Sequence, residues 1–175
     1  MIRKTLAIAA LLAASAVLAD DAAPVFDAGT ISGLGVRNIG SAAMSGRISS
    51  LDAIGMPDGK LAIWVGAASG GVWKSLDGGT TFEPVFDDQP VQSVGAVTID
   101  ARNPDTVWVG TGEAWTRNSV SIGDGIYRTS DGGDTWKNVG LPGSERIAEI
   151  LIDPRDSRTV YACVTGRLWS DSAER

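Results

Sequence analysis

Two acidic side chains, Glu113 and Asp124, lie near the ends of the longest segment that interrupts an internal repeat in this sequence. A pair of carboxylates on one face is what glycoside cleavage requires, with one acting as general acid and the other as base or nucleophile. The alternative, which their place in a loop favours, is that they brace the loop backbone. Residues 111–124 are therefore the first candidate for a functional loop.

The same segment carries side chains suited to a sugar or to an acidic peptide terminus. Trp115 lies within it, Arg117 and Asn118 follow, and Trp169 lies in a similar segment near the end of the chain. An exposed indole ring can stack on a sugar ring, while the alternative is that it anchors its own loop. These residues predict a surface that binds a carbohydrate or a protein or peptide ligand.

Two arginines, Arg47 and Arg146, precede equivalent segments of the repeat. Their guanidinium groups could bind a carboxylate or sulfate together. The alternative is that each pairs with a nearby acid such as Glu145 or Glu149. Both arrangements are compatible with the sequence.

Several kinds of chemistry have no residues to support them. The chain contains no histidine, which excludes His-based triads, His general bases and His metal ligands within it. No spacing typical of a metal site occurs, and no cofactor is predicted. Cys163 is the single cysteine, so no disulfide can form within the chain.

The first 19 residues are predicted to be a secretory signal peptide. Arg3 and Lys4 precede an apolar, Ala-rich run at 6–18, which is too short to span a bilayer, and Ala19 offers a small residue for cleavage. A buried N-terminal helix is the alternative. We therefore expect a secreted protein, periplasmic or extracellular, with no membrane span after cleavage and a flexible lead-in at 20–35.

The charge of the predicted mature chain argues against nucleic acid as a partner. Cleavage after Ala19 removes two of 15 positive charges and leaves 13 against 21 negative ones, a net charge of −8. A polyanion would be repelled by such a protein.

An eight-residue stretch occurs twice, as Ser-Leu-Asp-Gly-Gly-Thr-Thr-Phe at 75–82 and Thr-Ser-Asp-Gly-Gly-Asp-Thr-Trp at 129–136. This pattern suits a tight hairpin turn, because the carboxylate can accept backbone N–H groups and glycine adopts positive φ. The Thr hydroxyl can close the turn, and the aromatic ring can pack under the next strand. We assign this structural role to Asp77, Gly79, Thr81 and Phe82 in the first copy and to Asp131, Gly133, Thr135 and Trp136 in the second.

Around these turns the chain repeats a unit of four β-rich segments, here called A to D. We predict segment A at 48–54, 94–99 and 147–152, B at 61–66, 106–110 and 159–164, C at 72–75 and 126–129, and D at 81–86 and 135–139. Such units predict an all-β fold, a β-propeller of four-stranded antiparallel blades. The blades are placed at 45–90, 91–142 and, in part, 143–175. Because propellers contain at least about four blades, we expect an incomplete propeller whose partners include the remaining blades of a longer protein.

The repeat is interrupted at only one type of connection. Segments B and C are joined by 67–71 in the first unit and by the longer 111–124 in the second. Long loops on a rigid scaffold are where binding and catalytic residues concentrate. The face that carries the B–C connections is therefore the predicted functional face.

The repeated turn resembles the Asp box of bacterial neuraminidase (BNR) repeats. Further runs are similar to sortilin-type BNR-repeat proteins of bacteria, at 37–48, 65–75, 109–113 and 117–121. The resemblance covers 36–175 and implies a large secreted propeller, often labelled glycosyl hydrolase-like, that binds ligands. It does not by itself imply catalysis.

The sequence departs from catalytic propellers with similar repeats. Xyloglucan-cleaving propellers, which this sequence resembles in its Asp boxes, carry an Asp-Ile-Gly-Gly-x-Tyr strand. The resemblance implies that the Asp of this strand is catalytic in those enzymes. The matching run at 68–73 reads Ala-Ser-Gly-Gly-Val-Trp, with Ala68 in place of the carboxylate. The complete residue set of a sialidase is absent as well.

These observations predict a secreted ligand-binding propeller of the sortilin/BNR type, with no catalytic residues assignable in this chain. One alternative is a glycoside hydrolase that uses two carboxylates on the B–C face, one of them beyond residue 175. Another is a structural domain for protein–protein interaction.

Overall fold

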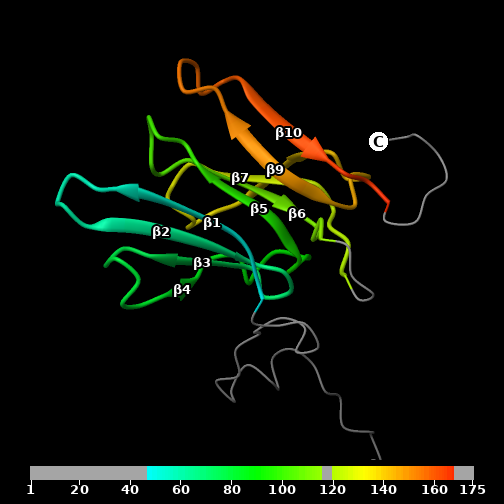
Figure 1. The fold of residues 1–175 in the computed structure, drawn as a ribbon, viewed down its shortest axis with the longest axis horizontal. Helices are drawn as coiled ribbons and strands as arrows, with labels where there is room; N and C mark the ends of the chain where they lie inside the picture. The colour runs from blue at the N-terminus through cyan, green and yellow to red at the C-terminus, as the bar shows by residue number, and fades with distance from the viewer. Residues whose placement is uncertain (1–46, 116–119, 168–175) are drawn as a thin grey trace, which may run out of the picture. The chain divides into compact units, whose positions relative to one another are not determined.

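The computed structural model describes residues 47–115 and 120–167, and every regular element in these ranges is a β-strand (Figure 1). The prediction of an all-β fold is therefore confirmed. The predicted signal peptide at 1–19 and the lead-in at 20–35 lie outside the described residues.

The strands form two four-stranded antiparallel sheets and one hairpin. The first sheet runs in the order β1 (Ile48–Gly55), β2 (Leu61–Ala67), β3 (Val72–Ser75) and β4 (Glu83–Pro84). The second runs β5 (Val94–Ile99), β6 (Val107–Thr111), β7 (Ile126–Thr129) and β8 (Lys137–Gly140). The hairpin pairs β9 (Ile147–Ile152) with β10 (Val160–Val164). Each sheet pairs consecutive strands as a propeller blade does.

The fourth strand of each blade is shorter or later than the sequence pattern indicates. The sequence predicts segment D of the first unit at 81–86, but only Glu83 and Pro84 pair as a strand. The reason is local, because Thr81 is held in the preceding turn by the Asp77 carboxylate. The ladder continues only in part, through a bond of 3.0 Å from Val85 N to Val72 O. In the second unit β8 begins at residue 137 rather than 135.

The inner strands β1, β5 and β9 lie side by side in that order (Figure 1). Side chains rather than backbone ladders link them. Asp52 Oδ2 accepts a hydrogen bond from Ile99 N at 2.7 Å, and Thr98 Oγ1 donates to Ile150 O at 2.7 Å. A polar side chain at the same register position of β1 and of β5 therefore bonds the backbone of the next inner strand.

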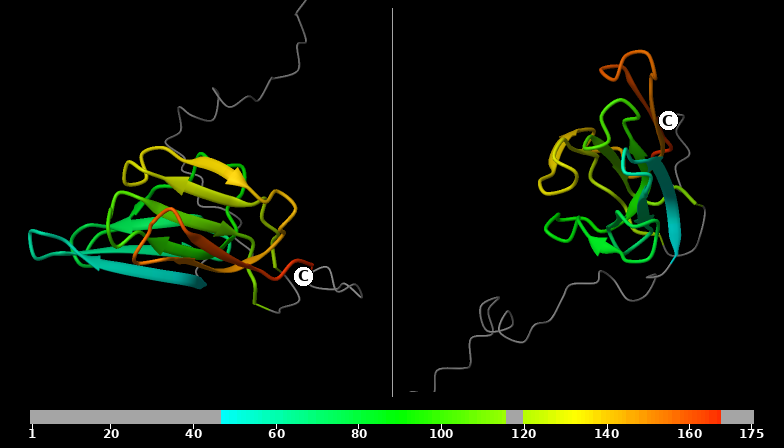
Figure 2. Two further views of the ribbon diagram at one scale, coloured as in Figure 1. Left: turned by 90° about the horizontal axis from the view of Figure 1, so that it is seen from above. Right: turned by 90° about the vertical axis from the view of Figure 1, so that its left-hand side faces the viewer.

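Two apolar clusters fill the spaces between consecutive blades. The larger joins the first and second sheets and is composed of Trp64, Val72, Phe86, Val94, Val97, Ile99, Val107, Val109 and Tyr127. The smaller, composed of Ala96, Ile126, Ile147 and Ile150, packs the second sheet against β9–β10. The hairpin β9–β10, orange to red in Figure 2, is therefore covered by the second sheet on one side. Blade stacking, not a single sheet, creates the core.

All three inner hairpins contain a β-bulge at the same place. The register shifts between Ile48 and Ser50 in the first hairpin, between Val94 and Ala96 in the second, and between Cys163 and Val164 in the third. In the second hairpin the extra residue is Gly95, where an added Cβ would lie 2.2 Å from Ile147 O. Bulges re-aim the residues beside them, so the start of each A strand is fixed in a common geometry.

Candidate functional site

The bulges lie at one end of the blades, where the second strand turns toward the third. We call this the B–C end and define it as residues 67–72, 111–115, 120–125 and 164–167. Each hairpin closes here through one equivalent backbone bond. The donors and acceptors are Ala68 N to Arg47 O (3.0 Å), Gly112 N to Ser93 O (2.8 Å) and Thr165 N to Arg146 O (3.1 Å). Arg47, Ser93 and Arg146 therefore occupy one structural position in three consecutive repeats.

Arg47 and Glu113, both predicted as binding residues, are brought together across the first two blades. Arg47 Nε donates to Glu113 Oε1 at 2.8 Å, and its Nη2 pairs with Oε2. The Glu113 side chain is 1% exposed and that of Arg47 is 22% exposed. A second bond fixes the acid, because Glu113 N donates to Ser93 Oγ at 3.1 Å. This bidentate pair is engaged within the protein and ties one blade to the next.

Asp124 is also engaged by its neighbours. Its Oδ2 accepts a hydrogen bond from the Tyr127 hydroxyl at 2.8 Å, and its N donates to Thr111 Oγ1 at 2.9 Å. Burial is the largest cause that raises the pKa of Tyr127, so the phenol stays protonated as the donor. Thr111 Oγ1 accepts from Gly125 N as well. Asp124 thus fixes the base of the B–C loop, and Glu113 and Asp124 do not form an open carboxylate pair.

Arg146 lies at the position of Arg47 but has no carboxylate facing it from another blade within the described residues. Its Nη1 donates to Gly166 O at 3.0 Å and lies 3.7 Å from Glu145 Oε2. Its Nε is buried without a hydrogen-bond partner, as are Ser144 Oγ and Thr165 Oγ1. A buried donor without a partner is unfavourable. Because Arg47 is bonded to Glu113 and Arg146 to Gly166 of its own hairpin, the two arginines do not share one site.

Trp115 is the predicted ligand-binding residue that the structure leaves most accessible. Its side chain is 65% exposed, and that of Ile122 is 57% exposed. An indole ring with this exposure is accessible for stacking on a ligand ring. Arg117, Asn118 and Trp169 lie outside the described residues, so their predicted role stays a prediction.

The two repeated turns lie at the opposite end of the blades and use their carboxylates for backbone closure. The Asp77 carboxylate accepts from Thr81 N at 2.9 Å and from Thr81 Oγ1 at 2.7 Å. These bonds lower the pKa of Asp77 to about 2, and bonds from Thr129 and Thr135 lower the pKa of Asp131 as well. Glycines with positive φ at 78, 79, 132 and 133 complete both turns. Ionised carboxylates held in this way cannot serve as general acids near neutral pH.

Sequence reasoning missed two small residues that organise the B–C end. Ser93 Oγ accepts from Glu113 N and donates to Ser121 O at 2.9 Å, which ties the loop to the blade. Thr111 joins both ends of the loop through its hydroxyl. The available signal was positional, because Ser93 aligns with Arg47 and Arg146 in the repeat. Ala68, at the position predicted to lack a carboxylate, is fully buried.

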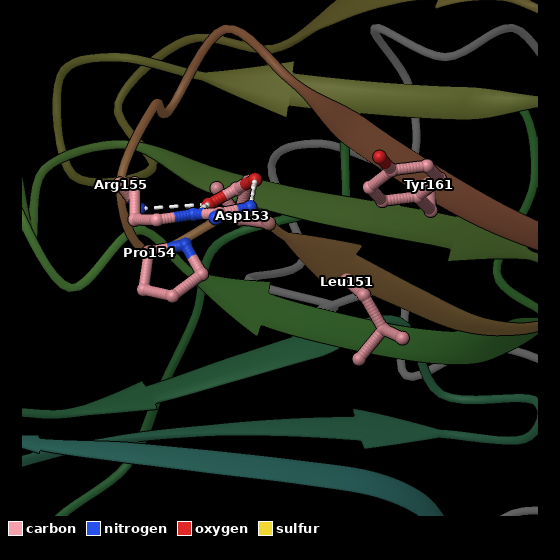
Figure 3. Close-up of a pocket in the computed structure, with 6 residues that line it drawn as sticks. Leu151, Asp153, Pro154, Arg155 and Tyr161 are labelled. Atoms are coloured by element: carbon pink, nitrogen blue, oxygen red, sulfur yellow. Dashed lines mark hydrogen bonds and ion pairs between the residues drawn. The ribbon is translucent and has the colours of Figure 1, made fainter.

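An open hollow of about 470 Å³ lies away from the B–C end, on the outer side of β9–β10. Leu151 and Tyr161 lie on the two strands, and Asp153, Pro154 and Arg155 lie on the turn that joins them (Figure 3). Arg155 Nη2 pairs with Asp153 Oδ2 at 2.8 Å. Neither a group of three potential metal ligands nor a helix long and apolar enough to cross a membrane occurs in 47–115 and 120–167.

Comparison with known proteins places the chain beside glycoside hydrolases. It is 30% identical over 87 residues to a xyloglucanase of a Paenibacillus species, a match that covers 43% of this chain and 8% of that protein. It is 31% identical over 100 residues to the oligoxyloglucan-reducing end-specific xyloglucanase of Emericella nidulans, covering 55% of this chain and 11% of the relative. No protein-family model matches.

The solved structure of an ancestral GH74 enzyme has a similar fold. It superimposes with a TM-score of 0.50 at 16% identity, covering 72% of this chain and 17% of that one. The fold is thus that of an incomplete β-propeller, and the chain spans about a tenth of its curated relatives. These findings support the coarser expectation of a glycosyl hydrolase-like β-propeller, whereas the sortilin/BNR type stays a prediction.

Proposed function

We propose that this chain is part of a secreted glycoside hydrolase-type propeller that binds xyloglucan or a similar polysaccharide at its B–C end. The observation that carries the proposal is that both curated relatives are xyloglucanases. The exposed indole of Trp115 on the B–C loop supports it, because an exposed aromatic face can stack on a sugar ring.

In this proposal the described residues bind and position the glycan rather than cleave it. Glycoside cleavage needs two carboxylates that reach the scissile bond. Glu113 is buried in its pair with Arg47, and Asp124 is bonded to Tyr127. The catalytic acids would therefore come from other parts of the propeller. The rigid loop base around Thr111 would hold Trp115 in place for stacking.

A second candidate is a propeller that binds its glycan without cleaving it. The observation that favours it is Ala68, which stands fully buried where xyloglucan-cleaving propellers have a carboxylate. The two candidates differ in the release of reducing sugar ends and not in the predicted binding surface.

The test is calorimetric titration of the chain with a xyloglucan oligosaccharide, alongside the Trp115→Ala variant. We expect the substitution to weaken binding by about 1–3 kcal/mol, or about 5- to 150-fold in Kd, as for a lost stacking contact. The matched control is Phe82→Ala, an aromatic residue 41% exposed at the opposite end of the blade. Equal affinity of Trp115→Ala and the parent chain would contradict the proposal. A parallel reducing-end assay on the longer protein separates the two candidates.

A further inference from the structure

One aromatic position recurs on the second strand of all three blades. Cross-strand pairing aligns Trp64 with Asp52, Trp108 with Thr98, and Tyr161 with Leu151, so the three rings are equivalent. The next blade covers the first two. Trp64 is 1% exposed, and its ring centroid lies 6.2 Å from that of Trp136 in the second blade. Trp108 packs against the cluster that contains Ile147 and Ile150.

The third member of this series is uncovered. Tyr161 is 62% exposed and Leu151 is 55% exposed, and together they line the hollow of Figure 3. We call the side of β9–β10 that carries these two residues the outer face. Glu149 and Cys163, which pair with each other two positions further along the strands, are exposed too. These four positions, which face the following blade in the first two repeats, are thus exposed in the third.

At the B–C end of the same hairpin, Arg146 lacks the ionic partner that Arg47 receives from its following blade. Arg47 of the first blade receives Glu113, the second residue after β6 of the following blade. Arg146 occupies the position of Arg47, yet it is folded back onto Gly166 and its buried Nε has no partner. An incoming carboxylate would replace this self-contact and satisfy the donor.

We propose that the outer face of β9–β10 docks a further Asp-box blade, and that this blade presents a carboxylate to Arg146 from the position that Glu113 holds in the second blade. The proposal is independent of the carbohydrate ligand. It follows from the repetition of one blade-to-blade geometry, since a blade cannot bury its own faces.

A second copy of this chain fits the outer face poorly, although its own first blade exposes Ile48 and Leu51. At the position of Glu113 that blade has Ser69, the second residue after β2, which brings no charge. Its Ile48, the equivalent of Val94 and Ile147, would also lie against Cys163.

Ile48 would clash with Cys163 because Cys163 has a side chain at a position where the earlier blades have glycine. A Cβ at Gly66 would lie 2.6 Å from Val94 Cγ1, and one at Gly110 would lie 2.5 Å from Ile147 Cγ2. The docking blade must therefore begin its inner strand with a smaller residue than valine. The occupant is defined by two features, a small first residue on its inner strand and an acid two residues after its second strand.

Cys163, the single cysteine of the chain, supplies the reporter because it is exposed on this face. The test extends the full chain after Arg175 with a second copy of 91–142, in which the copied Val94 is changed to alanine. The rate at which Cys163 reacts with a maleimide is compared with that of the parent chain. We expect the reaction to be at least about tenfold slower, since a docked face reacts only when it opens.

Two variants of the extended protein test the ionic contact. Arg146→Gln, or Glu113→Gln in the added copy alone, should restore most of the labelling rate, whereas Asp134→Asn in the added copy, an exposed change, should not. Hydrogen exchange shows whether the added copy is folded. A folded copy that leaves Cys163 fully reactive would overturn the proposal.

A further measurement uses the parent chain without an added blade. Its Cys163 should react at the same rate at low and high protein concentration. Protection that grows with concentration, together with a dimer in sedimentation, would assign the outer face to a second copy and overturn the proposal.

Discussion

Strand β6 of the second blade is largely buried on both faces, whereas the equivalent strand β10 of the third blade is mostly exposed. The two strands pair with their inner strands in the same register, so the sheet geometry is not the cause. The difference lies in their neighbours, because the second blade lies between two others and the third has one described neighbour. Burial in this protein is thus a property of the stack.

The two repeated turns show the same effect at the opposite end of the blades. Both close through the same Asp–Thr hydrogen bonds, but Phe82 is 41% exposed. Trp136 instead contacts the first blade, donating from Nε1 to Val85 O at 2.6 Å and packing edge-on against Phe86. Local chemistry closes the turn, and only a preceding blade buries its aromatic ring.

The largest effect is expected from Trp64→Ala. This side chain is 1% exposed between two blades, so its removal should lower the free energy of unfolding by about 3–5 kcal/mol. Tyr161→Ala is the matched control at the equivalent position. Since Tyr161 is 62% exposed in this chain, its removal should change stability by no more than about 0.5 kcal/mol. Urea unfolding monitors both, and equal losses would refute the account of burial by stacking.

Glu113→Gln should have the next largest effect. The change keeps the shape of the side chain but leaves the Arg47 guanidinium without its buried counter-charge. We expect a loss of about 2 kcal/mol, at the low end for a broken buried pair because Arg47 retains some contact with solvent. Asp58→Asn is the control, since its pair with Lys60 spans 3.8 Å on the surface and should contribute almost nothing. A similar loss for both variants would show that the pair does not stabilise the blade interface.

The sequence predicts those features that depend on neighbours along the chain. The Asp-Gly-Gly pattern and the alternating strands identify the turns, the strand order and the blade architecture, because each arises within one repeat. Strand ends were less predictable. The expected strand at 81–86 is cut short because the bonds from Thr81 to Asp77 hold its first residues in the turn.

The Arg47–Glu113 pair depends on a contact between two repeats, so patterns within one repeat do not predict it. Arg47 and Glu113 are 66 positions apart, and nothing in either local sequence says that they pair. The sequence predicts both as binding residues because charged side chains near a loop suit ligands as well as they suit each other. The repeat offered a positional signal, since Arg47 stands just before its inner strand and Glu113 stands two residues after the second strand of the following blade.

The smallest effect concerns pH and the repeated turns. Hydrogen bonds from Thr81 lower the pKa of Asp77 to about 2, and the pKa of Asp131 is lowered by Thr129 and Thr135. An Asp in an unfolded chain has a pKa of about 3.9. A carboxylate whose pKa is lower in the folded state stabilises it above the unfolded value and loses this contribution as the pH falls toward the folded value.

The variants Asp77→Asn and Asp131→Asn isolate this contribution from the other acids. Each should unfold at a lower urea concentration than the parent chain at pH 5, and the gap should narrow between about pH 4 and pH 2 as the parent's carboxylate becomes protonated. Asp134→Asn, an exposed change in the same second turn, should leave the urea midpoint unchanged at every pH. A gap that stayed constant down to pH 2 would mean that the turns are closed by geometry alone. Because both turns use the same bonds, the two Asp variants should respond alike even though only the second turn is covered by a preceding blade.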